Sequence, residues 1–257
     1  MTLLSLTAEE TSRRIAIGLL RDATAAAARV SGRADPEALH DLRVALRRLR
    51  SILRAFAEPL AGSVPKRRRA RLKALATSTG DARDAEVQVA WAASMLDGSL
   101  EPEERVAITF LRDRWAARRD GALASIDADV LPRLARLLPR VERDLSSYAR
   151  RYVVFSTAPT TPDVATVVAA LAETEIAALA ECLRRVSTID DEPIAHEARI
   201  HGKRLRYLLE PFRAERADVD DAVRALRSLQ ELLGDLNDRA VVYAGVEDAA
   251  RFRSADG

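Results

Sequence analysis

Cysteine and histidine are almost missing from this chain of 257 residues. The single Cys182 excludes an intramolecular disulfide framework and suits a reducing compartment. The three histidines form no HxxH or HxxxH motif, so no transition-metal site has a recognisable spacing. A glycine-rich phosphate-binding loop is absent as well. We therefore expect neither a metal nor another cofactor.

Long apolar runs and a strong net charge are also lacking. No run of about 18 apolar residues is available to span a bilayer, and the N-terminal MTLLSL is too short for the apolar region of a signal peptide. We expect a cytoplasmic protein that does not enter a membrane. The formal charge of +2, from 41 basic and 39 acidic residues, excludes a uniformly basic nucleic-acid coat. The positions of the charges must therefore indicate the function.

Alternating strand patterns are absent, and aromatic residues make up only 4% of the chain. Signals for helix starts recur instead: Thr7 and Glu10 form a capping box, and Pro36 and Pro65 mark further starts. Gly80 is predicted to end one helix and to precede another. Because 48% of the residues are hydrophobic, the chain can bury a substantial core. We predict an all-α fold.

The second part of the chain continues the helical pattern. Two helices are expected over roughly 101–127 and 131–151, with a break near residues 129–132. The stretch 156–162, STAPTTP, is the best internal linker. Beyond it we expect four more helices, opened near Thr161, Asp191, Asp218 and Asp235.

The two ends of the chain resemble each other. Residues 40–56, HDLRVALRRLRSILRAF, align with residues 196–212, HEARIHGKRLRYLLEPF. The match resumes where LKALATSTGDARDAEV at 72–87 aligns with LRSLQELLGDLNDRAV at 226–241. An internal duplication is the simplest explanation. It predicts one domain over 1–257, composed of a first helical repeat (7–98), a connecting helix pair (99–155) and a second helical repeat (161–253).

The basic residues of the first repeat lie in one row along a helix. At 100° per residue, one side of this helix carries only basic side chains, and the opposite side carries the apolar residues of the core. The row consists of His40, Arg43, Arg47, Arg50 and Arg54, over about 21 Å of helix. The second copy rebuilds it as His196, Arg199, Lys203 and Arg206, with Tyr207 on the same side as a hydroxyl donor. If the two copies face each other, the rows would line a shared cationic groove suited to a polyanion.

Several other residues have two possible roles. The run KRRRARLK at 66–73 is either an exposed helical face or a phosphate contact, and Lys73 is its best candidate because it aligns with Arg227. His201 aligns with Ala45 and is expected to be partly buried. Trp91 and Trp115 are expected to pack in the core or between helices of the bundle. We interpret Asp81, Asp84, Asp235 and Asp238 as helix caps, the alternative being that they orient arginines of the rows.

At these residues the sequence resembles the CHAD family, the conserved histidine α-helical domain. The motifs HDLRVALRRLR, HEARIHGKRLRY, LATSTGDARDAEV and LQELLGDLNDRAV carry the resemblance, which covers nearly the whole chain. It implies two pseudo-symmetric four-helix bundles around a basic cavity that binds inorganic polyphosphate. Some members are fused to a triphosphate-processing CYTH domain, but no ExExK motif precedes His40, so a stand-alone module is expected. Two departures are Glu210, which replaces the counterpart of Arg54, and Gly202, which replaces that of Leu46.

We therefore predict a non-enzymatic protein that binds inorganic polyphosphate and is targeted to polyphosphate granules. A nucleic-acid or nucleotide-binding helical protein is the alternative, because a phosphate backbone would also satisfy the rows. A phosphate-chain hydrolase would need a carboxylate cluster for Mg²⁺, which the sequence lacks. The predicted binding residues are His40, Arg43, Arg47, Arg48, Arg50, Arg54, Lys73, His196, Arg199, Lys203, Arg204, Arg206, Tyr207 and Arg227.

Overall fold

The computed structural model describes residues 2–32, 35, 37–155, 162–188 and 191–255. Within them the fold is all-α, as predicted, and an isolated bridge between Thr7 and Asp163 is the only extended pairing. The α-helices are α1 (Ala8–Gly32), α2 (Ala38–Ala55), α3 (Lys66–Thr77), α4 (Gly80–Leu96), α5 (Pro102–Ser125), α6 (Leu131–Phe155), α7 (Val164–Arg185), α8 (Glu192–Leu209) and α9 (Ala217–Ala255). Shorter helical turns are η1 (Leu3–Ser5), η2 (Ile126–Val130) and η4 (Glu210–Phe212).

The main hydrophobic core lies around α1 and α2, which pack along each other. Leu42, Leu46 and Leu49 of α2 are completely buried, on the side of the helix opposite to the basic row. α6 closes this core with residues such as Leu134. A second, smaller cluster joins α7, α8 and α9 around Leu205. Because the apolar side of α2 is anchored in this way, its arginines are held on the other side.

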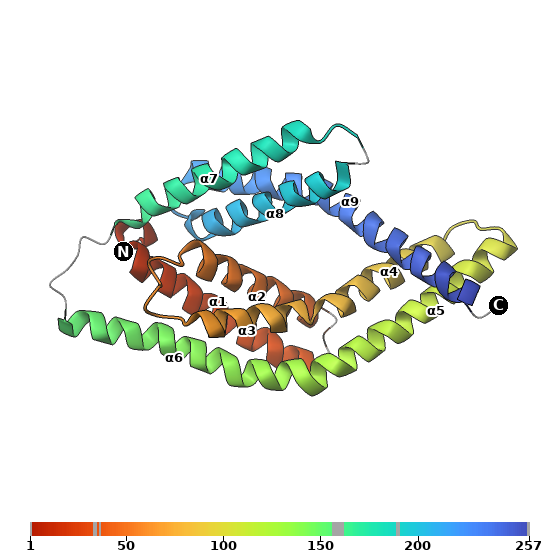
Figure 1. Cartoon of the computed structure of the whole chain (residues 1–257), viewed down its shortest axis with the longest axis horizontal. Coiled ribbons are helices and arrows are strands. Elements are labelled where there is room, and N and C mark those ends of the chain that lie inside the picture. Colours follow the sequence, from red (N-terminus) through yellow and green to blue (C-terminus); the bar gives the residue numbers. More distant parts are fainter. Residues whose placement is uncertain (1, 33–34, 36, 156–161, 189–190, 256–257) are drawn as a thin grey trace.

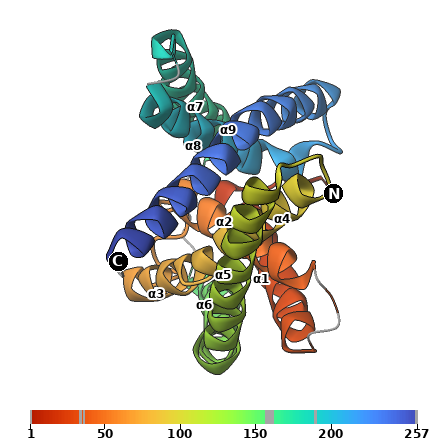
Figure 2. The ribbon, with the colours of Figure 1, turned by 90° about the vertical axis from the view of Figure 1, so that its right-hand side faces the viewer.

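The helices are arranged around α2. Helices α7 and α8 lie on one side of α2 and α6 lies on the other, as both views show (Figure 1 and Figure 2). Helices α4 and α5 extend away from this body, and the C-terminal part of α9 lies beside them (Figure 1). The amide of Gln88 on α4 donates a hydrogen bond to the carbonyl of Val241 on α9 (3.0 Å). Trp91 and Trp115 meet edge to face at 6.1 Å here, and Trp115 is buried, as expected.

Three expected helix boundaries differ in the structure. The helix break at Asp235 is wrong, because α9 continues through Gly234 to Ala255. A glycine inside a helix costs only about 1 kcal/mol relative to alanine. The continued helix also packs against α4. The contact is close at Gly245, where a Cβ atom would lie 2.3 Å from the amide nitrogen of Gln88.

The expected break at 129–132 is instead the π-helical turn η2, which joins α5 directly to α6 (Figure 1). Residues 156–161 of the predicted linker lie outside the described residues.

The third difference concerns the junction of α3 and α4. Gly80 does not end a helix but is the first residue of α4, and α3 ends at Thr77. The N-cap position therefore falls on Thr79, so Asp81 lies inside the first turn and does not cap the helix. Asp84 lies further along α4 and makes no cap either. The cap interpretation is thus wrong for this pair, and the side chains of Asp235 and Asp238 lie outside the described part of the chain.

Candidate anion-binding site

The arginines of α2 project from the face opposite to the core. Arg43, Arg47 and Arg50 are half-buried, whereas His40 and Arg54, at the two ends of the row, are exposed. The Arg43 guanidinium donates from Nη1 to the hydroxyl of Thr79 (2.9 Å), which itself donates to the carbonyl of Ala76 (2.8 Å). Thr79 is completely buried. This threonine therefore holds Arg43 in place. In the sequence, the only sign of a role for Thr79 was its position just before Gly80 in the aligned motif.

Burial makes the row electrostatically costly. It lowers the pKa of Arg43 and of Arg50, and the neighbouring Arg47 guanidinium lowers both pKa values further. The carboxylate of Asp84 on α4 acts against this and raises the pKa of Arg43. Burial in turn raises the pKa of Asp84. Arginine stays protonated in proteins, so the charges persist. An anion that approached the row would relieve this cost.

Two arginines of the row have no internal counter-ion among the described residues. No carboxylate of that part of the chain lies within ion-pair distance of Arg47 or Arg50. The Nε atom of Arg47 is also buried without a hydrogen-bond partner. A half-buried guanidinium without a partner is unfavourable in the free protein. These two residues are therefore the part of the row that is best prepared to bind an external anion.

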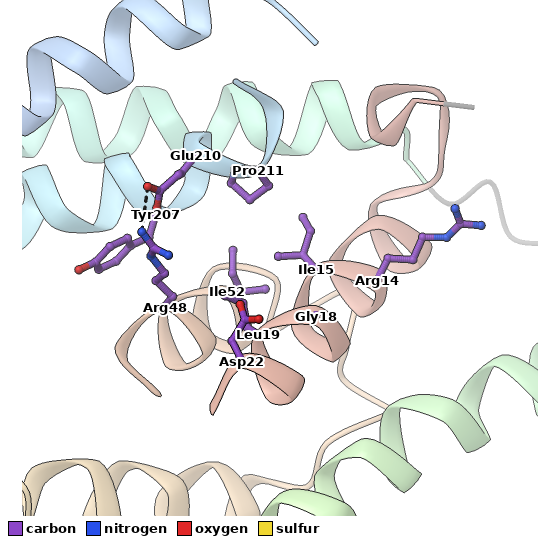
Figure 3. Close-up of a pocket in the computed structure, with 10 residues that line it drawn as sticks. All are labelled: Arg14, Ile15, Gly18, Leu19, Asp22, Arg48, Ile52, Tyr207, Glu210 and Pro211. Atoms are coloured by element: carbon purple, nitrogen blue, oxygen red, sulfur yellow. Dashed lines mark hydrogen bonds and ion pairs between the residues drawn. The ribbon is translucent and has the colours of Figure 1, made fainter. Parts of the chain in front are cut away.

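Glu210 has a role that the sequence did not indicate. Its carboxylate accepts hydrogen bonds from Arg48 of α2 (3.0 Å) and Arg227 of α9 (2.8 Å) and lies 3.6 Å from Arg206 of α8. Arg48 and Glu210 meet at a pocket of about 270 Å³ between α1, α2 and the end of α8 (Figure 3). Rather than only shortening the second row, Glu210 ties three helices together through arginines.

Glu175 of α7 is a second shared acceptor. It lies 2.6 Å from Nδ1 of His201, 3.5 Å from Arg54 and 4.0 Å from Arg204. His201 is half-buried, as predicted. No feature of the aligned motifs pointed to Glu175, because it lies outside them on α7. It links the end of the α2 row to α8.

The contacts between α2 and α8 are reciprocal. The position of Arg48 aligns with that of Arg204, and the position of Arg54 aligns with that of Glu210. Arg48 pairs with Glu210, and Arg204 lies close enough to Arg54 to lower its pKa, after the larger effect of burial. Aligned positions thus meet each other twice, which is what a twofold arrangement of two repeats would produce. The duplication itself, and the repeat boundaries, stay predictions.

The basic row of α8 is less exposed than that of α2 at its C-terminal end. Arg199 and Lys203 are half-buried, and His196 near the N-terminal end of α8 is exposed. The guanidinium of Arg206 lies over the ring of Tyr207, 4.6 Å from its centre. That ring is buried, so Tyr207 supports Arg206 instead of standing as an exposed member of the row.

The basic run at 66–73 divides among several environments. Arg68 forms an ion pair with Asp144 of α6, and Arg69 donates to the carbonyl of Leu53 (3.4 Å). Lys73 is exposed on α3, and Arg71 faces α6. The run is therefore not a single phosphate-binding segment. The Arg227 side chain, which aligns with Lys73, belongs instead to the cluster around Glu210.

In the described part of the chain, no group of three or more histidine, cysteine, aspartate or glutamate side chains is placed to hold a metal ion. The helices described are all too short or too polar to cross a membrane. Between α2 and α8, arginines of both helices share the carboxylates of Glu210 and Glu175, and Thr79 holds Arg43 further along α2. Together the fold and these residues define an all-helical protein with a built cationic surface.

Comparison with known proteins identifies the family. The model of the CHAD domain matches residues 14–244, and the chain therefore belongs to the CHAD family. The crystal structure of the CHAD domain from the plant Ricinus communis is similar, with a TM-score of 0.74 and 25% sequence identity. The match covers 96% of this chain and 81% of the plant chain. No curated protein sequence matches the chain.

Proposed function

We propose that this protein binds inorganic polyphosphate, without catalysis, in a groove lined by the basic rows of α2 and α8. The observation that carries the proposal is the half-buried row on α2, in which Arg47 and Arg50 have no carboxylate partner among the described residues. Guanidiniums bind phosphate oxygens through strong, often bidentate hydrogen bonds. Successive phosphates of a chain would supply the anions that Arg47 and Arg50 lack among the described residues.

The family supports the same ligand, because the CHAD domain is associated with polyphosphate binding. A nucleic acid would offer phosphates too, but its recognition usually recruits aromatic side chains on which bases stack. The one aromatic residue predicted in the rows, Tyr207, is buried beneath Arg206. We therefore place polyphosphate before nucleic acid. Association with polyphosphate granules would follow from such binding.

Titration with phosphate chains of increasing length tests the proposal directly. We expect the affinity to rise with chain length and to fall steeply with salt, because each neutralised phosphate releases condensed counter-ions. The measurement is a binding isotherm at several salt concentrations, competed by single-stranded DNA and by ATP. Equal affinity for orthophosphate and for long chains, or displacement by DNA at equal phosphate concentration, would contradict it.

The two exposed histidines predict a dependence on pH. His40 and His196 lie near the N-terminal ends of α2 and α8, at corresponding positions of the two rows. Imidazolium is favoured near a polyanion, so binding should strengthen several-fold as the pH falls from about 8 to about 6. The Kd should be measured across this range for the wild type and for the His40→Gln, His196→Gln double variant. If both proteins responded equally to pH, the histidines would not belong to the site.

A further inference from the structure

A second group of arginines lies on the other side of the molecule. Arg133, Arg136 and Arg140 follow one another on α6 at spacings of three and four residues, which places them on one face of the helix. Arg71 faces them from α3. The four side chains line a pocket of about 430 Å³. Because α6 and α8 lie on opposite sides of α2, this pocket is separate from the α2–α8 interface (Figure 1 and Figure 2).

The walls of this pocket are firmly built. Its apolar residues Leu75 and Leu137 are 7% and 6% exposed and belong to the main core. The two helices that carry the arginines are therefore fixed relative to each other by buried contacts. The distance along α6 from Arg133 to Arg140 is about 10 Å, since an α-helix rises about 1.5 Å per residue. The pocket thus presents a row of four arginine side chains, which are themselves exposed, on two helices that are fixed relative to each other.

The charge of the pocket is only partly balanced within the protein. Arg133 pairs with Asp129 (2.8 Å), and Arg136 donates from Nε to the carbonyl of Pro132 (3.1 Å). Within the described residues, Arg71 and Arg140 have neither an ion pair nor a hydrogen bond to another side chain. Like charges on neighbouring turns of a helix repel each other by a few tenths of a kcal/mol per pair. Among the described residues, none of those that line the pocket is a carboxylate, and Asp129 offsets this repulsion only at Arg133.

We propose that the pocket between α3 and α6 is a second site for a phosphate chain, distinct from the groove of α2 and α8. Several guanidiniums over about 10 Å suit a ligand with successive anionic groups better than a single phosphate. The inference rests on the proposed function for the identity of the ligand, and on the α3–α6 geometry for its place. With one site on each side, the protein would hold two chains, or two segments of one chain, at the same time.

The test compares three variants of the full chain. The pocket variant is Arg71→Glu with Arg136→Glu, and the row variant is Arg47→Glu. The control is Arg184→Glu with Arg216→Glu, which makes the same change of charge at two exposed side chains (72% and 58%) outside both sites. Binding of tripolyphosphate is measured by calorimetry, and bridging by long-chain polyphosphate is measured by light scattering. Circular dichroism confirms that each variant is folded.

We expect the wild type and the control to bind two tripolyphosphates and to form large assemblies with long chains. The pocket variant should bind one tripolyphosphate and form no large assemblies with long chains. The affinity of its one remaining site should equal that of the same site in the wild type. If the pocket variant bound as many tripolyphosphates as the wild type, the second site would be wrong and the proposed function would stand. If neither the wild type nor any variant bound, both would be wrong. If the pocket variant lost all binding, the groove of α2 and α8 would not be a site.

Discussion

Replacing Arg47 by glutamate is expected to weaken polyphosphate binding by about one to two orders of magnitude. A hydrogen bond to a charged group contributes about 1.5–3 kcal/mol, and every 1.4 kcal/mol is tenfold in affinity. Glutamate removes this contact and adds repulsion of the phosphates. Arg47 has no ion pair to lose within the described part of the chain, so the change should not break an internal contact of the fold. The measurement is the Kd for long-chain polyphosphate, with the melting temperature as a check.

Lys203→Glu, at the aligned position of α8, should weaken binding by a similar or smaller factor. Lysine lacks the planar fork of arginine, so its contribution to phosphate binding is expected to be lower. Arg184→Glu is the matched control, because Arg184 is exposed and, within the described residues, forms an ion pair only with its neighbour Glu181. If Arg47→Glu abolished binding while Lys203→Glu behaved like Arg184→Glu, the groove would not be shared and α2 alone would bind.

Glu210→Gln is expected to change stability and binding in opposite directions. The substitution keeps the shape of the side chain but leaves Arg48, Arg206 and Arg227 without their shared carboxylate. Breaking partly buried contacts of this kind costs about 1–3 kcal/mol, and for a domain of this size each kcal/mol lowers Tm by about 2–4 °C. Polyphosphate should bind several-fold more tightly, since its phosphates no longer compete with Glu210 for these arginines.

The appropriate control for this variant is Glu181→Gln, which removes one exposed partner of Arg184 and should leave both Tm and Kd nearly unchanged. The polyphosphate-induced rise in Tm should be larger for Glu210→Gln than for the wild type. A drop in stability without a gain in affinity would mean that Glu210 only fastens α2, α8 and α9 together. A gain in affinity at unchanged stability would mean that it acts only as a competing anion.

The two shared glutamates also explain how a protein can keep so many arginines near one interface. Glu210 and Glu175 each lie between arginines of α2 and of α8, so these two carboxylates offset repulsion between arginines of the two helices. The middle of the α2 row receives no such compensation from the described residues. The arginines that link the helices thus have carboxylate partners, and the ones that we propose to bind the ligand, Arg47 and Arg50, have none among the described residues.

Periodicity alone determined much of this protein. The all-α class, the apolar face of α2 and the opposite face of arginines follow from spacings within single helices, because side chains three and four residues apart share a face wherever the helix lies. The partial burial of His201 could also be predicted, since its aligned partner is apolar. Family membership followed from motifs that lie inside those same helices.

Only the tertiary structure decided what the helices do to one another. Whether Gly234 ends a helix depends on the packing of α9 against α4, which outweighs the small local cost of a glycine. The roles of Thr79, Glu175 and Glu210 arise because their partners are distant in the chain, and no local pattern records such contacts. The opposition of Arg71 to the α6 arginines has the same origin. The spacing of residues within a helix determines which face of the helix carries the charges. The counter-ion of each charge depends on which neighbouring helix packs against that face.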